Sequence, residues 1–508
     1  MRTGSFVSAI ATPTAPSPKP PPMLKQLFTR KTDFSHADDA HGHGLRRTLG
    51  PWGVTALGIG AVIGTGIFVV TGQAAAEHAG PAVLISFILA AVCSGFTALC
   101  YAEFATLIPI SGSSYSYAYA TLGELLAWFI GWNMVLEYGI SASAVAASWT
   151  GYFTSLLDHA GIHLPVALSD APLAFTDGRL VATGHLFNLP AVAIVLALTW
   201  LCYVGIRESA GINLLMVALK VGLIVIVVVA GYRYIDPANW HPFVPAAQGD
   251  GKYGWSGIFR GAAMVFFAYI GFEATSTAAQ ECKNPQRDLP FGMLVSLAIC
   301  TVLYLAMAAV LTGLIPYPQL DTVEPVVTAV RVHPQLGWLR LVVEVGALIG
   351  LSSVILVMII AQPRIFMIMA RDGLLPPVLG RIHPRYRTPH VNTLITGVCI
   401  AVLAAIFPLD LLANLTSMGT LIAFVAVCAG VLILRYTSPG LPRTFRVPWA
   451  WFTCTAGVLS CLALLLTFEW FNWALMIGWT AVGLVIYFGY GFRHSHVRRL
   501  LETQGKNR

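Results

Sequence analysis

Long apolar runs recur along the chain and are separated by short polar segments. A helix needs about 20 apolar residues to cross a hydrocarbon core of about 30 Å, and the longer runs must tilt or project beyond the bilayer. The runs cover roughly 52–76, 81–107, 124–155, 186–206, 210–232, 257–281, 289–315, 337–369, 391–407, 410–434, 449–467 and 472–491. The pattern predicts an all-α polytopic membrane protein with 12 transmembrane helices.

Composition supports this prediction, and the charges suggest an orientation. Hydrophobic residues make up 56% of the chain and charged residues only 10%, against about 25% charged residues in soluble domains. Of the 30 Lys and Arg residues, 23 lie on the side of the two termini and six on the other side. The positive-inside rule therefore predicts cytoplasmic termini in an inner (plasma) membrane. The net charge of +7 then reflects topology and lipid headgroups, and no nucleic-acid partner is expected.

Glycine interrupts the first and the sixth apolar runs. The first contains Gly64, Thr65 and Gly66, and the sixth contains Gly271. A broken helix at membrane depth is tolerated where the freed backbone lines a cavity or is buried in protein. Paired interruptions in corresponding positions point to the substrate site of an inverted-repeat transporter. Close helix packing through small residues is the alternative, and it is equally favoured for Gly58 and Gly60.

The freed backbone groups suggest which ligand such a site would hold. Amide N–H groups near Gly64 would begin an outer half-helix, where the dipole is positive and a carboxylate binds. Carbonyl groups in the unwound stretch Phe267–Gly271 can accept hydrogen bonds from an ammonium group. An anion receptor beside a cation receptor fits an α-amino acid.

Four segments carry a resemblance to a known family. They are GIGAVIGTGIF (58–68), YAEFATLIPISGSSYSYAYATLGE (101–124), FFAYIGFEATSTAAQECKNPQRDLP (266–290) and QPRIFMIMARDGLLP (362–376). The chain resembles the amino acid–polyamine–organocation (APC) superfamily of permeases over about residues 25–490. The likeness is strongest to the cationic amino acid transporter branch in its twelve-span bacterial form, without the spans 13 and 14 of vertebrate members. It implies a LeuT-like five-plus-five inverted repeat with discontinuous helices 1 and 6, followed by two additional helices.

The resemblance also implies roles for individual residues. Phe267 would cover the substrate as an outer gate. Met358 would occupy a position that is small in the arginine-carrying members, which favours small neutral amino acids such as alanine. Cationic amino acids or polyamines, carried by transport or exchange, are the alternative. The expected substrate-binding residues are Ile63, Gly64, Thr65, Gly66, Phe267, Ala268, Ile270, Gly271 and Met358.

Lys220 lies within the fifth apolar run. A charge at that depth costs on the order of 2.5–3.5 kcal/mol, so the side chain either snorkels to the interface or faces the bundle. In proton-coupled members, which this chain resembles, a lysine at this position takes over the structural charge of a sodium ion. Lys220 would then be the proton-coupling switch. Glu273 would assist it by pairing with Lys220 or with Thr65.

Three further carboxylates fall within apolar runs. Glu137 either faces the substrate route or is protonated and hydrogen-bonded to neighbouring helices. Glu103, near the inner end of the second run, favours a scaffold or gate role at the cytoplasmic face. Glu344 suggests no specific role.

The remaining features of the sequence argue against several other functions and sites. The sequence has no HExxH motif, P-loop or supported GxSxG motif. We therefore expect that the protein is not an enzyme and that it needs neither a cofactor nor an ATP-binding subunit. The expected partners are an amino acid substrate, a proton and the lipid bilayer. The run HADDAHGHG (36–44) and the nine scattered cysteines predict neither a metal site nor disulfides. We expect a disordered tail (1–48), a ten-helix transport core (49–434), two additional helices (435–492) and a cytoplasmic tail (493–508).

Overall fold

The computed structural model describes residues 23–31, 49–108, 112–176, 179–205, 210–249, 251–386 and 388–506. Seven helical segments in these ranges are long and apolar enough to cross a membrane, and four shorter apolar helices accompany them. About 79% of the described residues are helical. The protein is therefore a multi-pass membrane protein. The seven segments are Gly66–Leu107, Leu214–Tyr234, Gly254–Ala279, Pro285–Leu314, Pro334–Arg371, Leu409–Thr437 and Trp470–Thr503.

The main helical elements follow one another along the chain in a fixed order. They are α1 (Met23–Leu27), α2 (Pro51–Val62), η2 (Gly66–Val70), α3 (Thr71–Ala74), η3 (Ala75–Ala79), α4 (Val83–Leu107), α5 (Ser113–Thr121), α6 (Glu124–Val135), η5 (Leu136–Ile140), α7 (Ser141–His159), α8 (Leu189–Val204), α9 (Ala210–Gly231), α10 (Gly254–Val265), η9 (Phe266–Tyr269), η10 (Phe272–Glu281), α11 (Pro285–Leu314), α12 (Pro325–Arg331), α13 (Gly337–Arg371), α14 (His390–Ile406), α15 (Leu409–Thr437), α16 (Ala450–Leu465), α17 (Trp470–Ile486), η14 (Tyr487–Gly491), α18 (Phe492–His494) and α19 (His496–Lys506).

The apolar runs locate these helices to within a few residues. Helix α13, for example, begins at Gly337 and ends at Arg371, against a predicted run of 337–369. The expectation of an all-α chain is corrected by one antiparallel hairpin. Strands β1 (Leu173–Thr176) and β2 (Arg179–Ala182) pair between α7 and α8. This segment lies between two apolar runs, so its backbone pairs in a hairpin instead of a helix.

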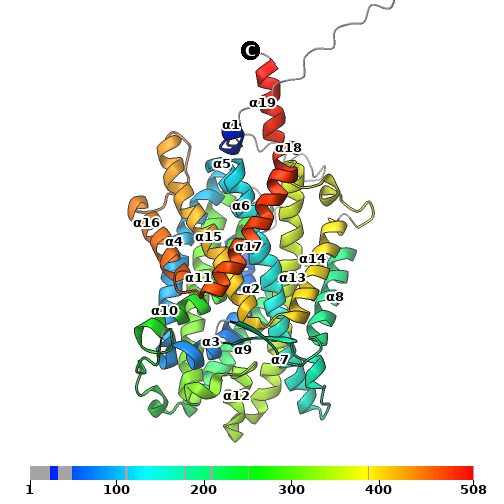
Figure 1. Ribbon diagram of the computed structural model, residues 1–508. Coiled ribbons are helices and arrows are strands. Elements are labelled where there is room, and N and C mark those ends of the chain that lie inside the picture. Colours follow the sequence, from blue (N-terminus) through cyan, green and yellow to red (C-terminus); the bar gives the residue numbers. More distant parts are fainter. Residues whose placement is uncertain are drawn as a thin grey trace, which may run out of the picture.

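Helices far apart in the sequence form the core. Helix α11 packs against α2 and α4, and α13 packs against α7 and α9. Figure 1 shows α1 and α19 at one end of the molecule and α12 at the opposite end. The interrupted first segment, α2 to α3, lies between these ends, against α9 and α11.

Part of the predicted disordered tail is ordered. Within residues 23–31, the Gln26 amide donates hydrogen bonds to Glu124 Oε1 (3.0 Å) and to the carbonyl oxygen of Phe492 (2.8 Å). Lys31 forms an ion pair of 2.7 Å with Asp372. These polar contacts join the N-terminal segment to the ends of three other helical segments. The histidine-containing run 36–44 lies outside the described residues.

None of the nine cysteines, all of which lie in the described residues, forms a disulfide, and eight of them are buried. Two pairs connect α4 with α16: the Sγ atoms of Cys93 and Cys461 lie 3.5 Å apart, and so do those of Cys100 and Cys454. Buried thiols of this kind pack as small apolar groups.

Candidate functional site

The first helical segment is interrupted where the glycines predict it. Helix α2 ends at Val62, and Ile63 is extended, with a ψ of 102°. The chain resumes in the π-helical turn η2 from Gly66, and the amides of Ile67 and Phe68 both reach the carbonyl oxygen of Gly64 (3.3 and 3.4 Å). The first amides of a new helical segment lack intrahelical acceptors. The break therefore presents N–H groups at a positive helix end.

The second interruption lies in the segment from α10 to η10. The 3₁₀ turn η9 ends at Tyr269, and Ile270 is extended. Gly271 has a φ of +122°, a conformation that favours glycine. Beyond it the chain continues as the 3₁₀ segment η10, and the amide of Gly271 donates to Glu273 Oε2 (3.0 Å).

The two interruptions pack directly on each other. A Cβ atom on Gly66 would lie 2.2 Å from Ala268 Cβ, and one on Gly271 would lie 2.8 Å from the carbonyl oxygen of Ala61. A Cβ atom at either position would collide with the other broken segment. Close packing therefore requires glycine at both positions, in addition to the role of glycine in the break itself. Gly58 serves packing on α11, because a Cβ there would lie 2.5 Å from Ser296 Oγ.

Lys220 holds the end of the first half-helix. Its side chain is 1% exposed, so the snorkelling alternative is wrong. The ammonium group donates to the carbonyl oxygens of Gly60 (2.7 Å) and Ile63 (2.9 Å). These carbonyls end α2, where the helix dipole is negative. A positive charge on α9 therefore stabilises the interruption of the first segment.

Tyr304 bridges the two interruptions, and the sequence analysis missed it. Its hydroxyl lies within hydrogen-bond distance of the carbonyl oxygens of Val62 (2.9 Å) and Ala268 (2.7 Å). The side chain comes from the middle of α11 and is fully buried. Its signal in the sequence is a lone hydroxyl-bearing ring in the apolar run ICTVLYLAMAAV.

The expected substrate-binding residues lie close together and are all buried. Thr65 Oγ1 has no hydrogen-bond partner among the described residues, although the sequence suggested a pairing with Glu273. A Cβ on Gly64 would contact Val354 Cγ2 at 3.1 Å, so α13 faces the first break. Met358 is one helical turn further along α13, and positions four apart share a face of a helix. Phe267 is 5% exposed in η9.

The remaining candidate carboxylates have different surroundings. Glu273 is fully buried at the second break, where its Oε2 accepts a hydrogen bond from the amide of Gly271. Glu137 in η5 is also fully buried, and neither of its carboxyl oxygens has a hydrogen-bond partner among the described residues. Glu103, near the C-terminal end of α4, forms ion pairs with Arg435 (2.5 Å) and Arg443 (3.2 Å). Glu103 thus joins α4 to the end of α15 and to the segment that follows it.

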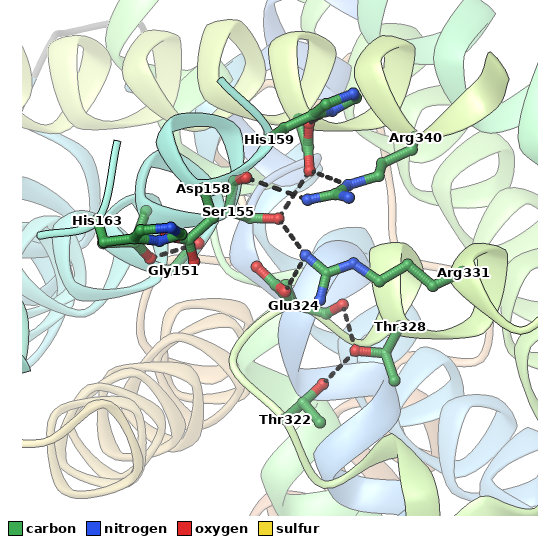
Figure 2. A network of polar contacts seen from close by, with 12 residues as sticks. Gly151, Ser155, Asp158, His159, His163, Thr322, Glu324, Thr328, Arg331 and Arg340 are labelled. Atoms are coloured by element: carbon green, nitrogen blue, oxygen red, sulfur yellow. Dashed lines mark hydrogen bonds and ion pairs between the residues drawn. The ribbon is translucent and has the colours of Figure 1, made fainter. Parts of the chain in front are cut away.

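A polar network lies at the end of the molecule that carries α12 (Figure 2). Ser155 Oγ in α7 donates to Glu344 Oε1 (2.7 Å) and accepts from Arg331 (2.8 Å). Arg340 also binds Glu344 Oε1 (2.8 Å), and Arg331 pairs with Glu324 (2.9 Å). The network connects α7, α13 and α12 and gives Glu344 the role that the sequence did not suggest.

The loop that carries α12 covers the first segment from this end. A Cβ on Gly72 would lie 2.4 Å from Pro325 Cβ, and one on Gly151 would lie 3.0 Å from Val323 Cβ. Glu324 precedes α12, and burial raises the pKa of its carboxyl group while the neighbouring Arg331 opposes the rise. With this loop in place, the broken segments are buried, so a ligand can reach them only after a conformational change.

Comparison with known proteins supports these observations. The sequence profile of the amino acid permease family matches residues 49–490. The chain is 45% identical to a branched-chain amino acid permease of Bacillus subtilis, over 90% of this chain and 95% of the relative. It is 43% identical to a methylthioribose transporter of the same organism, over 93% and 99%. It is also 37% identical to a vacuolar cationic amino acid transporter of Arabidopsis thaliana, over 82% and 64%.

Proposed function

This chain belongs to the amino acid permease family of the APC superfamily, and from that premise we propose that it is a secondary active transporter for small neutral L-amino acids such as alanine. Transport is coupled to the symport of protons. The observation that carries the proposal is the contact between two broken helical segments, one of which ends on the ammonium group of Lys220.

Backbone groups at the two breaks would hold the invariant part of the substrate. The amide groups of Gly64, Thr65 and Gly66 suit a carboxylate. Carbonyl groups between Phe267 and Gly271 suit the ammonium group. The unpartnered hydroxyl of Thr65 supports this assignment, because a buried donor without a partner carries a free-energy penalty that a ligand would relieve.

Lys220 would couple the movement of the proton to that of the substrate. In its charged form, Lys220 donates hydrogen bonds to the carbonyl oxygens of Gly60 and Ile63. The neutral amine has one N–H donor fewer and no charge, so its hydrogen bonds to these carbonyl groups are weaker. Desolvation disfavours the charged form of a buried amine, so loss of the proton from the buried Lys220 is physically accessible. Alternate opening to the two sides would then link proton release to release of the substrate.

The surroundings of the first break favour a neutral substrate. Met358 and Val354 place apolar groups on the face of α13 that adjoins Gly64, and the similarity to a branched-chain amino acid permease supports an aliphatic substrate. The cationic amino acid transporters among the relatives support the alternative, in which the protein carries or exchanges arginine, lysine, ornithine or a polyamine.

The proposal includes the architecture and the orientation. It assumes twelve spans in the plasma (inner) membrane, of which the first ten form a LeuT-like inverted repeat and the last two are additional. Both termini face the cytoplasm, as the distribution of Lys and Arg predicts. The end with α1 and α19 is then cytoplasmic, and the end with α12 is external (Figure 1).

Uptake into proteoliposomes tests the proposal. Under an inward proton gradient, without sodium or ATP, radiolabelled alanine should accumulate, and a protonophore should abolish the accumulation. An absolute sodium requirement would contradict proton coupling. Unlabelled leucine and arginine serve as competitors, and stronger competition by arginine than by alanine would favour the cationic alternative.

Variants of Lys220 separate coupling from binding. Lys220→Ala should lose gradient-driven accumulation and retain counterflow, which needs no driving force. Lys220→Arg should also fail, because a guanidinium group does not release its proton. Lys252→Ala, in the external loop, is the matched control and should transport normally. Full accumulation by Lys220→Arg would refute this role.

A further inference from the structure

An open groove lies between the end of α15 and the beginning of α16. Its volume is about 420 Å³, and the residues that line it include Arg435, Tyr436, Trp449, Trp451 and Phe452. Arg30, in the N-terminal segment, donates to Thr437 Oγ1 at the end of α15 (3.1 Å). The groove therefore lies at the end of the molecule that carries α1. Figure 1 shows α16 at the edge of the bundle, where it faces the surrounding lipid.

Four aromatic side chains of the groove are exposed, from 63% for Phe452 to 84% for Trp449. Aromatic rings are common where a membrane protein meets the membrane–water interface, so exposure alone does not make a site. The backbone at Trp449 and the hydrogen-bond donors beside the rings distinguish this groove from an ordinary aromatic belt.

Trp449 precedes α16 in a left-handed conformation, with a φ of 43° and a ψ of 53°. A bulky side chain rarely adopts such a backbone, and residues held in it cluster at functional sites and ligand clamps. In the described residues, the other two non-glycine residues with a positive φ are Ser113 and Tyr253. Both are buried and hydrogen-bonded, so packing explains them. Trp449 is exposed, so packing does not explain its strained backbone.

Two hydrogen-bond donors of the groove are available to a ligand. Arg435 Nε and Nη2 donate to the two oxygens of Glu103 (3.2 and 2.5 Å), and Nη2 also donates to the carbonyl oxygen of Val447 (3.2 Å). The third nitrogen, Nη1, has no acceptor among the described residues. The hydroxyl of Tyr436 accepts from Trp451 Nε1 (2.5 Å), so its own proton remains free to donate. A guanidinium and a hydroxyl donor suit the oxygens of a phosphate group.

Positive charge exceeds negative charge beside the groove. Arg435 and Arg443 both pair with Glu103, which is the one carboxylate in contact with these arginines among the described residues. Arg446 is exposed and precedes Val447, whose amide also donates to Glu103 (2.8 Å). Three guanidinium groups thus surround one carboxylate, and an anionic ligand would offset the excess charge.

From these observations we propose that the groove between α15 and α16 is a binding site for one anionic phospholipid. Its phosphate accepts hydrogen bonds from Arg435 Nη1 and the hydroxyl of Tyr436, and Arg446 adds electrostatic attraction. The ring of Trp449 covers the glycerol region. The site goes beyond the proposed transport function and does not depend on it.

The surface beyond the groove suits the acyl chains of such a lipid. The ring of Phe452 packs edge-on against Phe96 of α4, with the centroids 6.1 Å apart. Leu459 lies two turns further along α16 and is exposed, and residues seven apart share a face of a helix. The lipid would also support the junction of α4 with α15, because Arg435 joins these helices through Glu103.

Native mass spectrometry of the purified full-length protein tests the site. The protein is titrated with phosphatidylglycerol or phosphatidylethanolamine of identical acyl chains. The wild type should retain one phosphatidylglycerol at concentrations at which it retains no phosphatidylethanolamine. Inorganic phosphate should not displace the lipid, because it has no chains for the rings to contact; displacement by phosphate alone would overturn the proposal of a lipid site.

Trp449→Gly removes the ring and replaces a strained residue by one that adopts a positive φ readily. Retention of phosphatidylglycerol should fall, while the melting temperature stays unchanged or rises. A ring that served only the fold would give the opposite change in stability. Trp470→Ala, at a similarly exposed tryptophan at the beginning of α17, is the matched control and should retain the lipid. Equal losses in the two variants would identify an ordinary aromatic belt and overturn the proposal.

Arg446→Gln tests the charge without touching the ion pairs of Glu103. The affinity for phosphatidylglycerol should fall about tenfold, as expected when one charged group no longer contacts the ligand. Arg381→Gln, at another exposed arginine, should leave it unchanged. If Trp449→Gly does not fold, Arg446→Gln decides the question, and wild-type retention by this variant overturns the proposal. Equal retention of the two lipids by the wild type would overturn it as well.

Discussion

At the residue scale, the hydroxyl group of Tyr304 bridges the two broken segments, and Gly66 and Gly271 let them pack closely. Tyr304→Phe keeps the ring and removes the hydroxyl that reaches Val62 and Ala268. Loss of a donor from buried carbonyl groups costs about 1–3 kcal/mol, so we expect a lower melting temperature and reduced transport. Tyr269→Phe is the control, since its hydroxyl contacts the carbonyl of Phe87 at 3.1 Å; equal effects on transport would contradict a specific role for Tyr304.

Gly66→Ala and Gly64→Ala should differ in their effect on stability. The new Cβ of Gly66→Ala would collide with Ala268, whereas that of Gly64→Ala would meet only the tip of Val354. Overpacking costs typically about 1–3 kcal/mol, and we expect this cost at position 66. Thermal unfolding in detergent measures it. A folded Gly64→Ala protein with weakened substrate binding would support the backbone carboxylate site, and equal stability of the two variants would contradict the packing argument.

At the element scale, α12 and its preceding loop cover the end of the molecule opposite α1 and α19 (Figure 1). The carboxyl group of Glu324 has a raised pKa because it is buried. A group with a raised pKa in the folded state contributes stability that is present below its unfolded pKa and is lost as the pH rises through the folded pKa. The melting temperature of the wild type should therefore fall relative to Glu324→Gln as the pH rises through that window. Asp170→Asn, at an exposed carboxylate, should leave the pH profile unchanged; an unchanged profile in Glu324→Gln would disprove the assignment.

At the scale of the whole molecule, α1 connects the beginning of the described chain to its end. Gln26 contacts both Glu124 and Phe492. We expect Gln26→Ala to lower the free energy of unfolding by about 1–3 kcal/mol, because Glu124 loses a donor. Lys25→Ala, on the exposed side of the same helix, should change little. Equal effects of the two variants would mean that α1 contributes through its backbone alone.

The apolar pattern predicted most helices because membrane-spanning segments must be both apolar and long. The interruptions at Gly64–Gly66 and Gly271 were also predictable, since glycine weakens a helix locally. The contacts of Tyr304 and Ser155 were not, because their partners lie 36 to 242 residues away along the chain.

The facing cysteines of α4 and α16 allow a test, in the wild-type chain, of whether these two helices move relative to each other during transport. A disulfide requires the sulfur atoms to approach to about 2.0 Å, and Cys93–Cys461 and Cys100–Cys454 already lie in contact. We therefore expect a membrane-permeant oxidant to cross-link the two helices through a disulfide, without any engineered residue. Since α16 packs on α4 and α15, we expect cross-linked protein to keep transporting, as counterflow would measure. Arrest that a reductant reverses would instead identify sliding between α4 and α16 as a step of the cycle.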